Sequence, residues 1–471
     1  MKAKFILPAL IEAKSPFWRP IKYSLFPPLG LATLAGNMSP EDEIELVDEH
    51  VQAISIDDTP DLVVIQVYIT NAYRAYALAD HYRKHGSHVI LGGLHVTSMP
   101  HEASRHADTI VLGPGDEVFP RFLADFRRGR PERIYFSLRR SLVDIPEARR
   151  DLIKRELYLV PNSLVVSRGC PHHCDFCYKD PFYLGGRSFY TQRVDRALAE
   201  IESLPGRHLY FLDDHLLGHP YFAGQLFDGM QGMGRLFQGA ATVKSILQGD
   251  LIEKAVEAGL RSLFVGFETL NGANLRDANK RQTPGHDYRA AIKRLSELGV
   301  MINGSFVFGL DNDDKSVFRR TVDWAVERGL TTATFHILTP YPGTRLYAEM
   351  NKAGRIVSDD WNRYNTREVV YRPRNMTAGE LKAGYDEAYR SFYRWDAILR
   401  SSHVHRGRPM HAIKQLCYSA GWKKFEPLWN LLIKSKQLAI TRPLLESVLS
   451  RQTESASGPR PEHEKCVPTD R

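Results

Sequence analysis

The sequence has few cysteines and lacks any long apolar run. Only five of its 471 residues are cysteine, an odd number, and three of them lie between residues 170 and 177. This distribution is a poor disulfide framework and is typical of a metal or cluster site in a reducing compartment. No stretch of about 18 apolar residues occurs, so no transmembrane helix is expected. Because the start of the chain also lacks a convincing signal peptide, we expect a cytoplasmic protein.

Excess charge is confined to one segment. Residues 394–442 hold ten basic and two acidic residues, which equals the whole net charge of +8 and leaves the rest of the chain balanced. Such a segment is either a solvated helical surface or a contact for an anionic partner.

The first part of the chain alternates strand-like and helix-like segments. Short apolar runs between amphipathic segments are typical of buried parallel strands. These runs lie at residues 3–10, 43–50, 61–68, 88–93 and 109–113. The pattern predicts an α/β fold whose N-terminal domain, residues 1–130, is doubly wound and Rossmann-like, followed by a connector at 131–160. Ligands of such sheets lie at the carboxyl ends of the strands.

Six further strand-like runs alternate with helical segments over residues 161–365. They lie at 163–169, 207–214, 239–244, 262–268, 301–310 and 332–338. We interpret them as a partial, TIM-like (β/α)6 barrel, in which chemistry belongs at the carboxyl ends of the strands. The cysteines, a pair of aspartates and Glu268 all follow predicted strands, which points to one active site.

A helical, basic C-terminal region is expected over residues 366–451. It opens with a capping box, Thr377-x-x-Glu380. Residues 452–471 are polar and rich in proline, so we expect a disordered tail there.

The cysteine cluster allows two kinds of site. Cys170, Cys174 and Cys177 are soft thiolate ligands, suited to an iron–sulfur cluster or to zinc. A closed zinc site needs a fourth protein ligand, which His172 or His173 could supply only from within the same short loop. A [4Fe–4S] cluster held by three cysteines would instead leave one iron open to bind a small molecule.

The C-x3-C-x2-C spacing, with Phe176 before the third cysteine, resembles the radical S-adenosylmethionine (SAM) superfamily. The doubly wound first domain is similar to the cobalamin-binding subclass that includes the class B methyltransferases. The likeness extends over roughly residues 25–375 through "PPLGLATLAG", "GGLHVTSMP", "YFLDD" and "TPYPGTRLY". It implies one [4Fe–4S] cluster that reductively cleaves SAM to a 5′-deoxyadenosyl radical.

Carried over by position, the resemblance implies SAM-binding residues at the ends of the barrel strands. They are Phe176, Asp213, Asp214, Lys244, Glu268 and Ser305. The two aspartates end the second strand, where carboxylates suit the ammonium group of SAM. Lys244 and Glu268 are expected to end the third and fourth strands, with a structural ion pair as the alternative. Ser305 lies on the strand that resembles the adenine side, and a core strand is the alternative there.

Two residues of the last strand's exit loop, Tyr341 and Gly343, are expected to face substrate.

The resemblance also implies a cobalamin site at the strand ends of the first domain. Its candidate residues are Thr70, Asn71, Gly92, Gly93, His95, Thr97, Gly113 and Gly115. The D-x-H-x-x-G signature of many corrinoid proteins is matched only by Asp48-x-His50-x-x-Ala53, after the second strand, and we interpret this as a chance match. Cobalt would then have no histidine ligand below it, and His95 is the histidine better placed near a corrin.

The favoured function is cobalamin-dependent methylation of an unactivated carbon. The alternative is a radical SAM cyclase or oxidoreductase with the same domains and no methyl transfer. A tRNA methylthiotransferase would need a second cysteine cluster, and no cysteine precedes Cys170. The intact barrel pattern argues against a non-catalytic carrier.

The expected partners follow from this chemistry. They are a small-molecule or lipid substrate and a low-potential electron donor such as flavodoxin or ferredoxin. No nucleic acid is expected. The Trp-containing basic segment 394–442 would suit peripheral contact with an anionic membrane.

Overall fold

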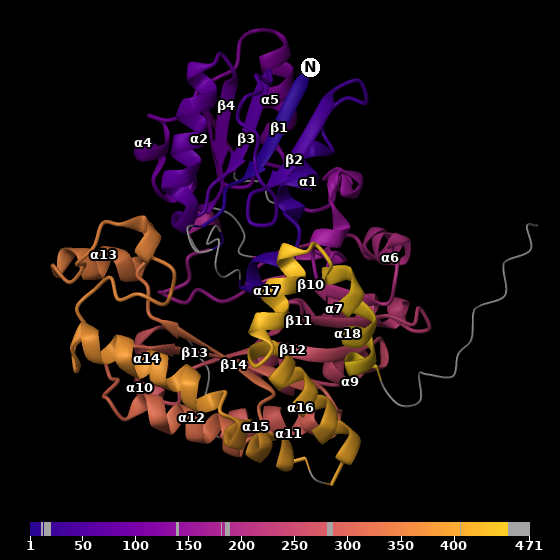
Figure 1. Cartoon of the computed structure of the whole chain (residues 1–471), viewed down its shortest axis with the longest axis vertical. Coiled ribbons are helices and arrows are strands. Elements are labelled where there is room, and N and C mark those ends of the chain that lie inside the picture. Colours follow the sequence, from indigo (N-terminus) through magenta and orange to yellow (C-terminus); the bar gives the residue numbers. More distant parts are fainter. Residues whose placement is uncertain are drawn as a thin grey trace, which may run out of the picture.

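The described part of the chain contains two parallel sheets, a short antiparallel hairpin and a helical C-terminal region (Figure 1). The computed structural model describes residues 1–10, 13, 20–137, 141–179, 181–183, 189–279, 286–405 and 407–450. In Figure 1 the indigo and purple N-terminal domain stands above the barrel, and the gold C-terminal helices lie against one side of that barrel. The predicted tail, 452–471, lies outside the described residues.

The N-terminal sheet has six parallel strands in the order β2-β1-β3-β4-β5-β6. They are β1 (Lys2–Leu7), β2 (Glu43–Asp48), β3 (Leu62–Gln66), β4 (His88–Gly92), β5 (Thr109–Leu112) and β6 (Ile134–Phe136). Its helices are α1 (Leu29–Ala35), α2 (Ala72–Lys84), α3 (Leu94–Ser98), α4 (Pro100–Ala103) and α5 (Val118–Arg127). Separate apolar clusters contain alternate residues of β3, so the sheet is covered on both faces as in other doubly wound folds.

Strand β6 lies inside the segment that the sequence analysis assigned to a connector. It pairs with β5 through Ile110 and Ile134. With only three residues, of which Tyr135 alone is buried, this edge strand has too little apolar periodicity to predict. The remainder of the segment contains two short 3-10 helices, Arg150–Leu152 and Arg155–Leu157.

The second sheet is an open barrel of six parallel strands in the order β14-β13-β12-β11-β10-β7. They are β7 (Ser163–Leu164), β10 (His208–Phe211), β11 (Leu236–Ala241), β12 (Leu260–Glu268), β13 (Met301–Phe308) and β14 (Thr332–Ile337). The helices around it are α6 (Val194–Ser203), α7 (Pro220–Met230), α8 (Val243–Leu247), α9 (Leu251–Glu257), α10 (Gly272–Asp277), α11 (His286–Glu297), α12 (Val317–Glu327) and α13 (Arg345–Lys352). The predicted partial barrel is therefore confirmed.

The described residues of the C-terminal region form five α-helices. They are α14 (Ala378–Phe392), α15 (Trp395–His403), α16 (Pro409–Lys423), α17 (Glu426–Lys434) and α18 (Arg442–Leu449). The predicted capping box starts α14, with Thr377 Oγ1 accepting from Glu380 N at 3.2 Å. Helix α14 packs on strand β14 and helix α12, at the open edge of the barrel.

Among the described residues, no helix combines the length and the apolarity that crossing a bilayer requires.

Candidate functional site

The three cysteines come directly after β8 (Ser167–Gly169) and before β9 (Phe189–Thr191), the two strands of a short antiparallel hairpin. The expectation that they directly follow the first barrel strand is wrong, because β7 ends at Leu164. The chain leaves the barrel there since Asp213, at the end of β10, accepts the next backbone N–H groups, those of Val166 and Ser167.

The cysteine loop is held by backbone contacts with two neighbouring helices. Cys177 N donates to Cys174 O at 2.9 Å, which closes a tight turn inside the motif. Asp175 N donates to the carbonyl of Ala278, just after α10, and Leu346 N on α13 donates to Asp175 O. The loop is therefore supported independently of any bound group.

The donor set fits an iron–sulfur cluster in its chemistry. All three thiols are partly buried on one loop, and Phe176 between them packs against the barrel core. Within the described ranges, no three His, Cys, Asp or Glu side chains are already gathered around one metal position.

Lys179 brings a positive charge to the cysteine loop. Burial lowers the pKa of its ammonium group, while the negative charges of Cys177 and Cys170 act in the opposite direction. Its ion-pair partner is Asp214, whose other carboxylate oxygen accepts from Gly169 N at 3.2 Å. Asp214 thus links the second barrel strand to the residue that precedes Cys170.

Asp213 is placed differently from its neighbour. Its side chain is buried, and its oxygens accept from Val166 N, Ser167 N and the Ser167 hydroxyl. Burial raises the pKa of this carboxyl to about 7 despite those hydrogen bonds. In this structure Asp213 therefore positions the hairpin rather than facing a cavity.

The barrel interior contains two of the other predicted SAM residues and one that the sequence analysis missed. Ser305 is buried on β13, and Glu268 ends β12 in a left-handed backbone conformation with φ of 64°. His336, on β14, lies near Glu268, whose charge favours the imidazolium, although burial lowers the pKa of His336 overall. The sequence could have indicated His336, because Thr334 and His336 are two residues apart on a predicted strand and therefore point to the same face of the sheet.

Lys244 is not at a strand end. Strand β11 stops at Ala241, and Lys244 is exposed on helix α8, which Thr242 caps through its hydroxyl. The prediction that it ends the third strand is wrong, since β11 ends three residues earlier and a helix capped by Thr242 begins at Val243.

A cavity of about 300 Å³ separates the first domain from the cysteine loop. The first domain contributes Thr70 and His95, and the barrel side contributes Tyr178 and Tyr341. The rings of Tyr178 and Tyr341 lie 5.5 Å apart, so the cysteine loop and the last strand's exit loop meet at this wall.

Gly343 closes the same junction. A Cβ atom there would lie 3.0 Å from Pro181 and 3.1 Å from the Ser98 hydroxyl oxygen, and φ is +86°. The exit loop thus approaches both the segment after the cysteines and helix α3.

His95 lies in helix α3, not in an open loop. It is buried, its Nε2 is 3.3 Å from Glu102 Oε1, and its ring packs edge-on against Trp361. Burial lowers its pKa, and Glu102 partly opposes this. His50, the chance match, pairs through Nδ1 with Asp48 at 2.8 Å and stacks on Tyr23.

The other candidate cobalamin residues shape the carboxyl edge of the N-terminal sheet. Gly93 has φ of +116°, and a Cβ there would stand 2.8 Å from Val67 O. Thr97 Oγ1 donates to Gly93 O and accepts from Gly113 N, so it joins two strand-end loops. Asn71 is engaged, with its side chain bonded to Tyr68 N and Pro8 O.

Gly92 and Gly115 leave room at the same edge. A Cβ on Gly92 would lie 3.5 Å from Val111, and one on Gly115 would lie 3.4 Å from Leu34.

A larger cavity, of about 560 Å³, lies at the point where the strand order reverses. Leu7 ends β1, Gln66 ends β3, and both line it together with Gly30 of α1. Tyr68 lines this cavity and the one at the cysteine loop, so the two are neighbours. Ligands of open α/β sheets bind at such switch points, a feature that strand order alone reveals.

Comparison with known proteins agrees with this arrangement. The sequence model of the Radical SAM superfamily matches residues 164–325, and that of the B12 binding domain matches residues 24–123. Residues 164–325 therefore form a radical SAM domain, and residues 24–123 form a B12 binding domain. The predicted cofactors, a [4Fe–4S] cluster, SAM and cobalamin, are confirmed at the level of these two domains.

Several relatives of this radical SAM protein have named activities. Bacteriochlorophyllide d C-12(1)-methyltransferase of Chlorobaculum tepidum is 26% identical over 399 residues, covering 82% of this chain and 86% of that protein. An anaerobic magnesium-protoporphyrin IX monomethyl ester cyclase of Cereibacter sphaeroides is also 26% identical, over 66% of this chain and 55% of that protein.

Solved structures share the fold. TsrM from Kitasatospora setae, a radical SAM methyltransferase with cobalamin and a [4Fe–4S] cluster bound, has a TM-score of 0.63 at 13% identity. It covers 93% of this chain and 99% of its own.

Proposed function

We propose that this radical SAM enzyme is a cobalamin-dependent methyltransferase that acts on an unactivated carbon. The observation that carries the proposal is the cavity lined on one side by Thr70 and His95 and on the other by Tyr178 of the cysteine loop. A substrate there would lie between the two cofactor-binding regions. When bound, the cofactors supply the radical and methyl-transfer chemistry, and the protein contributes their placement.

We assign the chain's residues to this task by their positions. Cys170, Cys174 and Cys177 would hold the cluster. Phe176, Asp214, Glu268 and Ser305 would surround SAM, and Asp213 is a positioning residue for the hairpin. Lys244 lies on the outer surface and is left out of this set.

For cobalamin, the glycine-rich edge formed by Gly92, Gly93, Gly113 and Gly115 admits a ligand close to the backbone. Thr70, His95 and Thr97 would border it, while Asn71 supports the edge from within. Both His50 and His95 are engaged with carboxylates, so we propose neither of these two as a cobalt ligand.

Tyr341 and Gly343 would face the substrate at the junction of the two loops. The electron would come from a low-potential donor such as flavodoxin or ferredoxin, and the partly exposed cysteine loop suits such delivery.

Peripheral membrane contact through residues 394–442 is a separate part of this proposal. Some of its cations serve the fold, since Arg408 donates to the carbonyls of Ser296 and Glu297, and Arg442 to that of Tyr158. Lys434 and Lys436 are exposed, and in this proposal they would contact the anionic surface.

The decisive experiment uses anaerobically purified, cluster-reconstituted protein with SAM, cobalamin and a low-potential reductant. Mass spectrometry would quantify 5′-deoxyadenosine and S-adenosylhomocysteine. Cys170→Ala should abolish both products, whereas Cys466→Ala, which alters a cysteine outside the motif, should leave both unchanged. Deoxyadenosine without S-adenosylhomocysteine would favour the cyclase or oxidoreductase alternative, and absence of both would contradict the proposal.

A further inference from the structure

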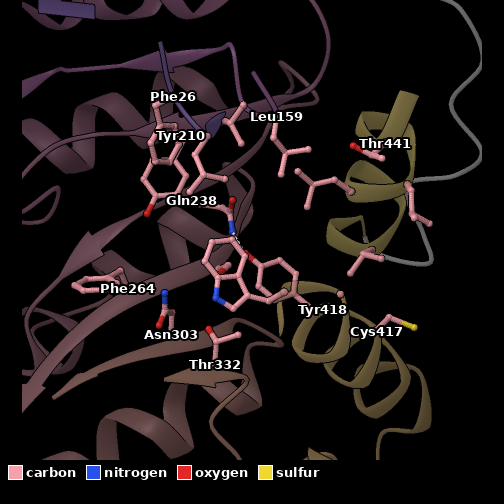
Figure 2. Close-up of a pocket in the computed structure, with 18 of the residues that line it drawn as sticks. Phe26, Leu159, Tyr210, Gln238, Phe264, Asn303, Thr332, Cys417, Tyr418 and Thr441 are labelled. Atoms are coloured by element: carbon pink, nitrogen blue, oxygen red, sulfur yellow. Dashed lines mark hydrogen bonds between the residues drawn. The ribbon is translucent and has the colours of Figure 1, made fainter. Parts of the chain in front are cut away.

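A third cavity lies at the opposite end of the barrel from the cysteine loop. This cavity of about 300 Å³ is lined by Tyr210, Gln238 and Asn303, each the third residue of its strand (Figure 2). Helices α16 and α18 close it from the other side, as Cys417 and Tyr418 in Figure 2 illustrate. The amino end of a barrel normally serves stability alone, so a cavity there needs an explanation.

The cavity lies directly below the proposed SAM site. Asn303 and Ser305 occupy the same face of β13, two residues apart, which corresponds to about 7 Å along a strand. A ligand in this cavity would therefore lie along the barrel axis. It would be separate from the cavity between the two domains, which Thr70, His95, Tyr178 and Tyr341 line.

Much of the wall is apolar, and several of its polar groups are already hydrogen-bonded within the protein. Gln238 Nε2 donates to the Tyr418 hydroxyl at 2.9 Å, and Gln238 Oε1 is bonded to His208 Nε2 at 3.1 Å. Trp429, which also lines the cavity, donates its indole N–H to Gly421 O at 2.7 Å. An entering ligand meets aromatic faces and aliphatic groups, so it need not supply hydrogen bonds to avoid a desolvation cost.

The cavity reaches an unusual part of the surface. Leu444 lines it and is 67% exposed, and the nearby Leu431 and Ile440 are 62% and 67% exposed. Ten of the nineteen exposed large apolar side chains in the described part of the chain fall within residues 395–444. Lys434 and Lys436 are exposed on the same segment, and apolar side chains rimmed by cations are typical of helices that lie on anionic membranes.

We propose that this cavity is a second ligand site, which takes the apolar chain of an amphiphilic lipid from an anionic membrane surface. Its volume is at the small end of ligand pockets and suits a single alkyl or prenyl chain. The site is additional to the methyl-transfer site, and its existence does not depend on that activity.

The test is a fluorescence titration of the full-length, cluster-loaded protein with a hexadecyl chain that carries a dansyl group. Saturable binding is expected, and Leu444→Asp should weaken it about tenfold, or about 1.4 kcal/mol. The matched control is Leu431→Asp, a similarly exposed leucine that does not line the cavity. Equal loss in both variants, or no saturable binding, would overturn the site.

A second measurement needs no substitution. Cys417 lines the cavity and is exposed, so a bound chain should slow its alkylation by iodoacetamide, read peptide by peptide in a mass spectrometer. An unchanged rate of Cys417 alkylation at a saturating concentration of the hexadecyl probe would count against the site. The Cys170→Ala variant should bind the hexadecyl probe normally. Loss of probe binding can therefore be distinguished from loss of methyl transfer.

The membrane source is tested with vesicles. The protein should sediment with vesicles that contain phosphatidylglycerol and not with pure phosphatidylcholine, and Lys434→Glu with Lys436→Glu should abolish the difference. If the protein binds the alkyl chain but sediments equally with both kinds of vesicle, the proposal that the lipid comes from an anionic membrane is wrong.

Discussion

Asp213 is a buried carboxyl whose charge state bears on how firmly the cysteine-bearing hairpin is held. Its ionised form is stabilised by three donors from Val166 and Ser167 and destabilised by burial, and the second effect is larger. At the residue scale, this carboxyl group thus makes the stability of the fold depend on pH.

We expect the stability contributed by Asp213 to fall as the pH rises from about 4 to about 7. The folded-state pKa of about 7 lies above the unfolded value of 3.8, so the folded state holds the proton more tightly across that window. The difference corresponds to at most about 4 kcal/mol. Urea unfolding of the apoprotein at pH 5 and pH 7.5 should show this loss.

Asp213→Asn is the comparison for that measurement. The amide does not ionise, so its free energy of unfolding should change less between the two pH values, although its overall stability should be lower because one acceptor oxygen is lost. Parallel pH profiles for the two proteins would contradict the assignment.

At the scale of elements, the turn between β4 and α3 sets the edge at which cobalamin is proposed to bind. Gly93 has a positive φ of +116°, and the carbonyl of Val67 occupies the space that a Cβ atom at this position would need. The edge strand β14 is protected in a different way, because Tyr389 of α14 and Tyr393, just after that helix, hydrogen-bond to its outward backbone groups.

Gly93→Ala should destabilise the fold and abolish cobalamin retention. Its Cβ would meet Val67 O at 2.8 Å, which adds about 1–3 kcal/mol to the cost of the positive φ. Gly86→Ala is a matched control, with φ of +90° and nothing within 4 Å. It should lose only about 1–2 kcal/mol and keep cobalamin, as judged by visible absorbance and thermal unfolding.

Tyr393→Phe should lower the free energy of unfolding by about 1–3 kcal/mol. The Tyr393 hydroxyl donates to Ala333 O and accepts from Ala333 N, and Tyr389 does the same with Phe335, so both protect the open edge of the barrel. The measurement is urea unfolding, with the exposed Tyr221→Phe as control. A loss no greater than in that control would contradict this role.

At the scale of the whole molecule, the two domains are joined at their facing strand ends. Arg168 of hairpin β8–β9 forms an ion pair with Asp116, in the loop after β5. Both side chains are largely buried, so the pair is worth more than an exposed one.

Arg168→Ala should therefore separate methyl transfer from SAM cleavage. We expect 5′-deoxyadenosine to form nearly as before, while S-adenosylhomocysteine falls about tenfold because the first domain is held less well against the cysteine loop. The ratio of the two products measures the effect. An equal fall in both would indicate damage to the cysteine loop itself.

Much of the fold follows from local patterns. The apolar runs that became β1 to β5 and β10 to β14 are recognisable because burial on both sides of a parallel strand requires them. The missed features were short or depended on distant partners. Strand β6 has one buried residue, and the predicted strand at 163–169 divides into β7 and β8 where Asp213 accepts from Val166 N and Ser167 N.

The sequence by itself determined the family, the cluster loop and the alternation of strands and helices, because cysteine spacing and apolar periodicity are local properties. Only the tertiary structure decided which residues share a cavity. Tyr178 and His95, or Tyr210 and Tyr418, meet through the arrangement of whole sheets and helices. No local pattern encodes such contacts, because each depends on the packing of elements that lie far apart along the chain.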